Sequence, residues 1–324
     1  MIQRGLVLGK FLPYHEGHAL LVRSARAQVD RLTVLVCSIS REPIPGALRY
    51  HWVAASHPDC RVVHVAEEVP QAPEDDPDFW PIWTDLVRRY AGDVDVVFTS
   101  EMYGDELAAR LCARHICVDP GRRGVPISGT AIRQDPMINW QYIPPIVRPY
   151  FVRRVAVLGT ESTGKTTLAE TLAHELHTVW VPEYGRGYCE NRDPLALTAE
   201  DFDAIGKGQA RDEDEAATRA NRLLICDTDL RTTATWCDLI VGTRPAWLAE
   251  AAARRRYNHV LLLDADVPWV QDGTRVLRDE RIEHTERLRR ELERTEQPYT
   301  LISGSWAERH TEARAVLECI LAGR

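Results

Sequence analysis

The segment Arg154-Val-Ala-Val-Leu-Gly159-Thr-Glu-Ser-Thr-Gly164-Lys165-Thr166 joins a short apolar run to a turn with two glycines and then to a helical pattern. The turn matches G-x-x-x-x-G-K-[ST], in which glycines let successive backbone N–H groups point inward and bind phosphate oxygens. The partial positive charge at the start of the following helix adds to this attraction. The segment therefore predicts a P-loop with an α/β domain built around it.

The side chains of this loop have expected tasks. Lys165 reaches the β- and γ-phosphates of ATP, and the Thr166 hydroxyl can hold Mg²⁺. Asp227 follows the apolar run 223–226, at the strand end where P-loop proteins place a magnesium-side carboxylate. Capping of the following turn is the alternative interpretation of Asp227. The residues expected to bind ATP here are Gly159, Glu161, Ser162, Thr163, Gly164, Thr166 and Thr167.

Two further basic residues are expected at the same site. Arg275 ends the sequence Asp272-Gly-Thr-Arg275, and Arg281 follows it closely. This spacing resembles the arginine lid of small-molecule kinases, which neutralises charge on the phosphoryl group that is transferred. Arginines on a solvated helix are the alternative. We expect Arg275 and Arg281 to contribute to ATP binding.

Short apolar runs alternate with helical patterns along the chain. The runs are 5–9, 32–38, 61–65 and 94–100 in the first half and 154–158, 178–181, 223–226, 260–263 and 299–302 in the second. This alternation is typical of α/β proteins with parallel, doubly wound sheets. The proline-bearing stretch 143–149 interrupts it. We therefore expect two three-layer α/β domains, 1–148 and 149–324.

Composition excludes several classes of protein. Of 324 residues, 44% are hydrophobic and 27% are charged, and the net charge is −8, so neither disorder nor a broadly basic surface for nucleic acid or membrane is expected. No apolar run is long enough for a membrane span or signal peptide, so we expect a cytoplasmic protein. The eight cysteines lack Cys-x-x-Cys spacing, and Cys37 and Cys226 lie in apolar runs, which indicates reduced, buried thiols.

A second phosphate-binding signal opens the chain. Gly9-Lys10-Phe-Leu-Pro-Tyr-His15-Glu-Gly-His18 follows the first apolar run and precedes the first helical pattern. Two histidines three residues apart at a helix start point their rings the same way, toward an anion at the helix end. Zinc would need further spaced ligands, which the sequence does not supply. Downstream, Ile127-Ser128-Gly-Thr130-Ala-Ile-Arg133 offers hydroxyls and a guanidinium to phosphate oxygens, although Ser and Thr are also ordinary helix caps.

Together the two motifs resemble the signatures G-x-F-x-P-x-H-x-G-H and I-S-x-T-x-I-R of the nucleotidyltransferase superfamily. A nucleotidyltransferase domain joined to a P-loop domain resembles the bacterial NadR-type enzymes, and the likeness extends over nearly the whole chain. It implies a Rossmann-like nucleotidyltransferase domain followed by a P-loop kinase domain. Some members carry an N-terminal helix-turn-helix that makes them repressors. Here the first strand begins within the first ten residues, so we do not expect repression.

The resemblance implies two consecutive reactions. In the P-loop domain the 5′-hydroxyl of nicotinamide riboside attacks the γ-phosphoryl group of ATP, which gives nicotinamide mononucleotide (NMN) and ADP. In the first domain the phosphate of NMN attacks the α-phosphorus of a second ATP, which gives NAD and pyrophosphate. The alternatives are a similar enzyme pair for another vitamin-derived nucleotide and a nucleotide-sensing regulator whose catalysis has decayed. The oligomeric state stays open.

The resemblance also gives tasks to residues of the first domain. His18 would bind the α-phosphate, and His15 and Lys10 the triphosphate. Arg133 would bind the departing pyrophosphate. Gly129 stands where many relatives have Ser or Ala, and we expect this to matter little because the position contributes a backbone N–H. Further ATP-binding residues would be Gly9, Phe11, Ser128 and Thr130.

The acceptor of the kinase reaction is a ribose hydroxyl, which benefits from a general base. Glu183 is our first choice and Asp227 our second. Glu183 follows the run 178–181, which we place beside the P-loop strand. Gln209 could hydrogen-bond the nicotinamide carboxamide, with a surface glutamine as the alternative. The flat, cationic nicotinamide ring favours an aromatic face. The candidates, each also consistent with a core position, are Trp80 and Trp83 in the first domain and Tyr184 and Trp269 in the second.

Overall fold

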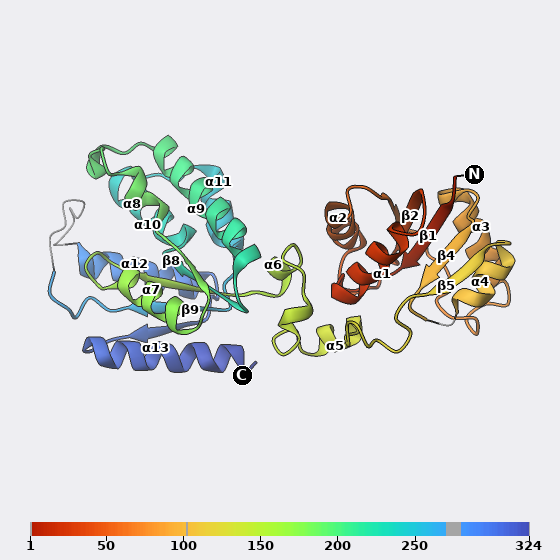
Figure 1. Cartoon of the computed structure of the whole chain (residues 1–324). Helices are drawn as coiled ribbons and strands as arrows, with labels where there is room; N and C mark the ends of the chain where they lie inside the picture. Colours follow the sequence, from red (N-terminus) through yellow and green to blue (C-terminus); the bar gives the residue numbers. More distant parts are fainter. Residues whose placement is uncertain (1, 102, 270–279, 324) are drawn as a thin grey trace. The chain divides into compact units, whose positions relative to one another are not determined.

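The computed structural model describes residues 2–101, 103–269 and 280–323 (Figure 1). The chain forms two compact units, Met1–Val147 and Arg148–Arg324. Each unit is built on a parallel sheet of five strands, so the expected pair of α/β folds is confirmed. Within the described ranges, no helix combines the length and the apolar character that crossing a membrane requires.

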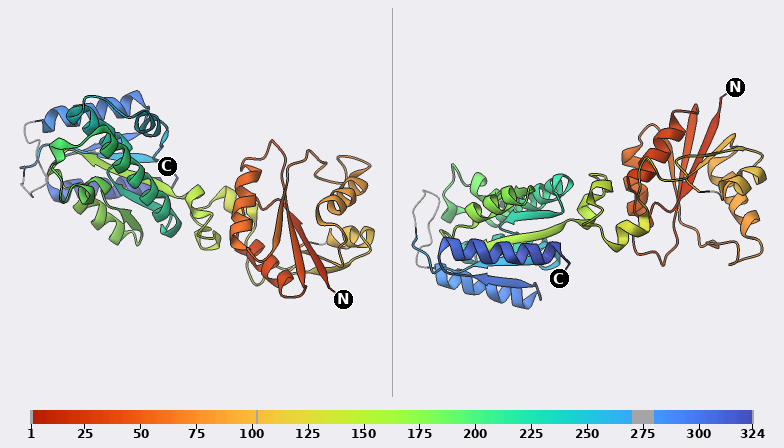
Figure 2. Two further views of the ribbon diagram at one scale, coloured as in Figure 1. Left: turned by 90° about the horizontal axis from the view of Figure 1, so that it is seen from above. Right: turned by 60° about the horizontal axis from the view of Figure 1, so that its bottom comes forward.

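The first unit has the strand order β3-β2-β1-β4-β5. Its strands are β1 (Arg4–Gly9), β2 (Arg31–Cys37), β3 (Arg61–Val65), β4 (Val96–Thr99) and β5 (Arg114–Cys117). Its helices are α1 (Glu16–Arg26), α2 (Gly46–Ser56), α3 (Phe79–Ala91), α4 (Gly104–Arg110) and α5 (Gly129–Gln134). Figures 1 and 2 show α1 and α2 on one face of the sheet and α3 and α4 on the other. The strand order reverses at β1, and such sheets bind ligands beyond the carboxyl ends of the strands at this point.

A continuous core fixes the position of β1. Leu6 of β1, Leu35 of β2 and Val97 of β4 pack against Leu86 of α3 and Leu107 of α4, and all five are buried. Burying each such side chain contributes roughly 1.5–3 kcal/mol. The end of β1, and the histidine motif that follows it, therefore start from a rigid position.

The second unit has the strand order β10-β9-β6-β8-β7. Its strands are β6 (Arg153–Gly159), β7 (Val179–Val181), β8 (Leu223–Asp227), β9 (His259–Leu263) and β10 (Tyr299–Ile302). Its helices are α6 (Arg148–Phe151), α7 (Lys165–Glu175), α8 (Tyr184–Tyr188), α9 (Ala199–Arg219), α10 (Leu230–Ile240), α11 (Ala246–Arg254), α12 (Arg281–Arg294) and α13 (Trp306–Leu321). Figure 2 shows α13 on one face of the sheet and α9 on the other.

The P-loop strand β6 lies at the centre of this sheet. Val155 and Val157 of β6 pack with Leu168 of α7 and Leu317 of α13, all fully buried. Because β6 is buried on both sides, the loop at its end is anchored by a packed core.

The sheet order corrects one expectation. β7 pairs with β8, while β6 is flanked by β8 and β9, so β8 separates the strand before Glu183 from the P-loop strand. Both edges of β6 are occupied, and β7 must take an outer place. The structure also contains elements that the sequence analysis missed, among them β5, α6, α8, α10 and α13.

Candidate active sites

The P-loop follows β6 and opens α7, where the sequence predicted it. Gly159 and Gly164 have φ values of 145° and 87°, a backbone conformation that residues with side chains rarely adopt. A Cβ on Gly159 would also lie only 2.8 Å from the carbonyl oxygen of Leu263 in β9. Lys165 Nζ donates a hydrogen bond of 3.0 Å to the carbonyl of Thr160, which holds its ammonium group over the loop.

Asp227 faces the P-loop from the end of β8. Thr166 Oγ1 donates a hydrogen bond of 2.5 Å to Asp227 Oδ2, while Asp227 Oδ1 is buried without a hydrogen-bond partner. Burial, together with the negative charge of Glu183, raises the pKa of Asp227 to about 6. Capping of the turn, the alternative task for Asp227, is carried out by Asp229 instead. The Asp229 carboxylate accepts hydrogen bonds from the backbone N–H groups of Arg231 and Thr232. Asp227 is therefore a buried carboxylate with one oxygen that lacks a hydrogen-bond partner.

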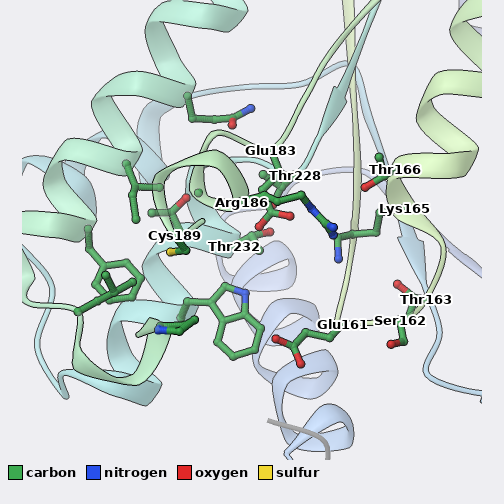
Figure 3. A pocket seen from close by; sticks show the side chains of 18 of the residues that line it. Glu161, Ser162, Thr163, Lys165, Thr166, Glu183, Arg186, Cys189, Thr228 and Thr232 are labelled. Carbon is green, nitrogen blue, oxygen red and sulfur yellow. The ribbon is translucent and has the colours of Figure 1, made fainter. Parts of the chain in front are cut away.

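A pocket of about 350 Å³ lies beside the P-loop, on the β8–β7 side of the sheet. Glu183 and Arg186 reach it from the start of α8, and Figure 3 shows these two side chains close to that of Lys165. Phe202 of α9 and Trp236 of α10 form an aromatic wall. The pocket thus combines a carboxylate, cations and flat apolar surface, which suits an aromatic acceptor that carries a hydroxyl group.

Several residues of this pocket were missed by the sequence analysis, including Arg186, Thr228, Thr232 and Trp236. One signal was present. Thr232 and Trp236 are four residues apart, which places them on one face of a helix, and Thr228 comes four residues before Thr232, just ahead of that helix. The ring of Trp236 is fixed from behind by the buried imidazole of His284, 4.1 Å away.

The predicted nicotinamide residues of the second unit have other surroundings. Tyr184 packs over Gly208, where an added Cβ would lie 2.4 Å from its ring, and neither Tyr184 nor Trp269 is among the pocket's lining residues. Gln209 does line the pocket, but its Oε1 accepts from the Tyr184 backbone at 2.9 Å and its Nε2 donates to Glu213 at 3.4 Å. Gln209 is 1% exposed, so the surface alternative is wrong.

The predicted arginine lid is described only in part. Arg275 lies outside the described residues, as does the sequence around it. Arg281 begins α12 and donates a hydrogen bond of 3.1 Å to the carbonyl of Val267. Arg281 is also 9% exposed, which does not fit the alternative of a solvated arginine.

In the first unit, His15 and His18 lie at the start of α1 with stacked rings whose centroids are 3.8 Å apart. His15 is also the cap of that helix, because its Nδ1 accepts from the backbone of Gly17 at 3.1 Å and of His18 at 3.3 Å. An Nδ1 atom that accepts two N–H groups cannot carry a proton, so the neutral ring carries its proton on Nε2. His15 therefore has one N–H to offer to a ligand.

Both imidazoles are neutral at physiological pH. Burial, with a smaller contribution from the charge of Arg122, lowers the pKa of His15 to about 4. Burial and the neighbouring His15 lower the pKa of His18 well below its usual range. With no anion bound, the lowered pKa values favour neutral rings, which can each donate one hydrogen bond to a phosphate oxygen.

A second pocket of about 350 Å³ opens in front of these histidines. It brings the motif after β1 together with the motif around α5, two segments more than 100 residues apart in the sequence. Its lining includes most of the predicted ATP-binding residues of this unit, namely Lys10, Phe11, His15, His18, Ser128, Thr130 and Arg133.

A hydrogen bond from Arg133 joins the two motifs, and further hydrogen bonds order the second motif internally. Arg133 donates to the carbonyl of Leu12 and, at 3.1 Å, to Thr130 Oγ1. Ser128 Oγ accepts from the backbone N–H of Ala131 at 3.1 Å, so Ser128 is also the cap of α5. The expectation that the residue type at Gly129 matters little does not fit the packing seen here, because an added Cβ would lie 2.5 Å from the carbonyl oxygen of Leu12. A side chain at position 129 would require one of the two motifs to shift.

Lys10 is held at the rim of this pocket by a buried pair. Its Nζ lies 3.4 Å from Glu42 Oε1, and Glu42 also accepts from the fully buried Arg49. Arg49 donates in addition to the backbone carbonyl of Lys10. Both ends of the lysine are therefore positioned by residues outside the motif.

Arg122 is a pocket residue that the sequence analysis missed. It lines the pocket together with Glu101, whose Oε1 lies 3.4 Å from its NH2 atom. No pattern in the sequence distinguishes Arg122 from its neighbour Arg123. Its position depends on a loop in which Asp119 accepts from the backbone of residues 123–125.

Trp80 and Trp83 belong to α3 and pack against the hydrophobic core of the first unit. Trp83 Nε1 donates to the carbonyl of Pro70 at 2.9 Å, and the ring of Trp80 lies under Arg110. Neither is among the residues that line the pocket in front of the histidines.

Comparison with known proteins follows the same division of the chain. A cytidylyltransferase-like family model matches residues 6–135, and an AAA domain model matches residues 154–309. The trifunctional NAD biosynthesis/regulator protein NadR of Escherichia coli (strain K12) is 33% identical over 295 residues, which cover 84% of this chain and 72% of that protein. The chain belongs to the NadR family. The resemblance inferred from the motifs is thus confirmed.

Two further relatives of this NadR-family chain extend the comparison. A solved structure of NadR, described as a complex with NR, matches 98% of this chain and 95% of its own with a TM-score of 0.79 at 22% identity. This likeness shows that the fold is that of NadR. The nicotinamide-nucleotide adenylyltransferase of Thermococcus kodakarensis is 26% identical over 194 residues, which cover 57% of this chain and all of that protein.

Proposed function

We propose that this chain makes NAD in two ATP-dependent steps, phosphorylation of nicotinamide riboside to NMN and adenylylation of NMN to NAD. The observation that carries the proposal is that a NadR-family chain holds two separate phosphate-binding pockets, each with its own set of donors. We assign adenylyl transfer to residues 1–148 and riboside phosphorylation to residues 149–324.

In the kinase step the 5′-hydroxyl oxygen of the riboside attacks the γ-phosphorus of ATP, and ADP leaves. Glu183 lines the acceptor pocket and is our candidate to take the hydroxyl proton. Lys165 and Arg186 are cations that line the same pocket as this carboxylate, and they would stabilise the charge that spreads over the transferred phosphoryl oxygens (Figure 3). Catalysis then rests on positioning and on fixed positive charge.

Asp227 and Thr166 fit a magnesium ion bound with ATP. The orphaned Oδ1 of Asp227 and the raised pKa of its carboxyl both indicate a site that gains by receiving a cation. Mg²⁺ commonly uses one or two protein ligands and completes its shell with phosphate oxygens and water, so two oxygen donors suffice. When bound, the ion would neutralise phosphate charge. Asp227 and Thr166 would hold it, directly or through water, on the P-loop side of the pocket.

Nicotinamide recognition in the kinase is better supported for Trp236 and Phe202 than for our earlier candidates Tyr184 and Trp269. The rings of Trp236 and Phe202 line the pocket, and Thr232 lies one helical turn before Trp236. A cationic ring gains from contact with an indole face. Gln209 keeps a role as a wall of the pocket, with its amide oriented by Tyr184 and Glu213.

In the adenylyl-transfer step an NMN phosphate oxygen attacks the α-phosphorus of ATP, and pyrophosphate leaves. The attacking phosphate is already anionic, so no general base is needed. His18 and the Nε2–H of His15 would donate to the phosphates of ATP, and Lys10 and Arg133 would balance the charge of the leaving group. Arg122 lies in the same pocket and adds a further cation. Trp80 and Trp83 remain candidates for the nicotinamide face in this unit.

One assay tests the proposal directly. The chain is incubated with nicotinamide riboside and Mg-ATP, and NMN, NAD and ADP are followed by chromatography. Successive appearance of NMN and NAD is expected. Turnover of another vitamin-derived nucleoside in preference to the riboside would contradict the substrate assignment, and absence of turnover with any of them would favour a regulator without catalysis.

A further inference from the structure

An exposed tryptophan covers the P-loop on the side away from the acceptor pocket. Trp306 is the first residue of α13 and is 44% exposed. Its indole lies against the loop, because a Cβ added to Gly164 would be 3.4 Å from its Cζ3 atom. Large exposed apolar side chains are costly unless they have a ligand or partner, so this position calls for an explanation.

The corner that carries Trp306 is rigidly joined to the loop. Arg309, only 1% exposed, donates to the carbonyls of Thr163 at 3.3 Å and Asp264 at 3.1 Å. It also pairs with Asp266, whose other oxygen accepts from the backbone of Gly304 at 2.6 Å. One buried guanidinium therefore connects the P-loop with the β9 end and the β10–α13 corner. The start of α13, from which Trp306 projects, is therefore fixed relative to the P-loop.

The sheet order places Trp306 and the acceptor pocket on opposite sides of the loop. Apart from the P-loop itself, the pocket is lined from α8, α9, α10 and the turn after β8. Trp306 follows β10, and β6 lies between β8 and β10 in the sheet. A triphosphate in the loop must present its γ-phosphate to Glu183 in the pocket. Its nucleoside end then leaves the loop toward β9 and β10, the side on which the partly exposed Trp306 lies.

We propose that Trp306 is the stacking surface for the adenine base of ATP in the kinase unit. The inference rests on the proposed phosphoryl transfer for the identity of the nucleotide. Arg309 is a positioning residue in this arrangement, since it fixes the indole relative to the phosphate cradle. Stacking uses the face of the base, so it strengthens binding without taking part in the chemical step.

The test compares the unmodified full chain with Trp306→Ala, Trp306→Phe and Trp247→Ala. Trp247 is a matched control because it is 37% exposed and lies on α11, outside the residues that line the pocket. For Trp306→Ala we expect the KM for ATP in riboside phosphorylation to rise roughly 5- to 100-fold with kcat changed less than about threefold. Trp306→Phe should retain most of the affinity, and Trp247→Ala should match the unmodified chain.

Two further measurements separate the base from the phosphates and one ATP site from the other. Inorganic tripolyphosphate has no base. Its inhibition constant in riboside phosphorylation should therefore be the same for all four proteins. The KM for ATP in adenylyl transfer should be the same in all four. An unchanged KM for ATP in Trp306→Ala overturns the inference. Parallel weakening of ATP and tripolyphosphate also overturns it, because Trp306 would then shape the loop and not hold the base.

A second experiment distinguishes failure of the proposed kinase function from failure of the inference about Trp306. If the unmodified chain does not phosphorylate the riboside, binding is measured by equilibrium titration with a non-hydrolysable ATP analogue. The binding component that Lys165→Ala abolishes belongs to the P-loop. Trp306→Ala must weaken that component, and an unchanged component overturns the inference.

Discussion

Thr166 and Asp227, 61 residues apart in the sequence, are joined by a hydrogen bond of 2.5 Å across the base of the kinase pocket. This contact leaves one oxygen of Asp227 buried and unpartnered, while Glu183 lines the open pocket. The two carboxylates therefore have different surroundings and different expected tasks. Asp227 is expected to hold the metal, and Glu183 is expected to act on the acceptor hydroxyl.

Replacing each carboxylate by its amide should cause a different kinetic defect. Glu183→Gln keeps the size of the side chain but cannot take a proton, so we expect the kinase rate to fall by roughly 10²–10⁴ with little change in ATP affinity. Asp227→Asn should weaken Mg-ATP binding and should be partly rescued by high magnesium. Kinase rates, nucleotide affinities and magnesium titrations of both variants decide the matter. If Asp227→Asn lowers only the kinase rate and Glu183→Gln has nearly normal activity, then Asp227 would be the general base and Glu183 the residue at the magnesium ion.

The two reactions should be separable by single substitutions. Lys165→Ala removes the ammonium group over the P-loop and should abolish riboside phosphorylation, while adenylylation of supplied NMN stays within a few-fold. His18→Ala should lower adenylyl transfer by roughly 10²–10³ and spare the kinase. Each variant is assayed for both products. Loss of both activities in either one would argue against two independent sites.

His15 combines a structural and a chemical task, and two substitutions can separate them. Asparagine is a good helix cap and can replace the acceptor that Nδ1 provides, whereas alanine cannot. We expect His15→Ala to destabilise α1 by about 1 kcal/mol and His15→Asn to keep nearly normal stability. Both should lose adenylyl-transfer rate, because both lack the Nε2–H. Thermal unfolding and NAD formation are measured in parallel, and full activity in His15→Asn would remove the ring from catalysis.

Stability of the first unit should depend on pH through His15. Its pKa is about 4 in the folded state and about 6.5 in an unfolded chain. Between these values the unfolded chain binds more protons, so the stabilisation is complete above about pH 6.5 and is lost as the pH falls toward 4. Denaturant titrations at several pH values should show this decline, and His15→Asn should make it shallower without removing it, because the buried His18, whose pKa is also lowered, contributes in the same direction. An equal decline in the variant would assign the effect to other groups.

Gly129→Ala should disturb the adenylyl-transfer pocket. Its Cβ would lie 2.5 Å from the Leu12 carbonyl oxygen, and forced overpacking of this kind costs about 1–3 kcal/mol. We expect a lower unfolding midpoint and slower adenylyl transfer with normal kinase activity. Gly121→Ala is the matched control, because its nearest neighbour would be the Arg123 side chain at 3.5 Å. Normal adenylyl transfer in Gly129→Ala would show that the close contact with Leu12 is dispensable.

The parts of the fold that the sequence predicts are those set by local chemistry. The P-loop and the histidine motif are recognisable because glycines, a lysine and ring nitrogens must stand at fixed spacings next to a strand end. β5 was missed because it begins Arg114-His115 and shows no apolar run. α10 was missed because its threonines are weak helix formers, and its stability comes from packing against α9 and α12.

The walls of the pockets were harder to predict because they depend on sheet order and helix placement. Nine tryptophans occur in the chain, and any of them could offer an aromatic face. Only the position of α10 beside the P-loop selects Trp236. The place of Glu183 was predicted at a strand end, but spacing along the chain cannot tell that β8 lies between that strand and β6. Arg122 shows the same limit, since a loop fold alone distinguishes it from Arg123.

The hydrogen bonds of Arg309 affect the order in which the two sites can form during translation. Arg309 is 146 residues beyond Thr163, whose carbonyl it holds. At about 5–20 residues per second, a ribosome needs roughly 7–30 seconds to bridge that interval. During this time the nascent P-loop has its full sequence but not the buried guanidinium that fixes its shape. The histidine pocket of the first unit can form while the second half is still being translated, whereas the P-loop gains this contact only when α13 has been made.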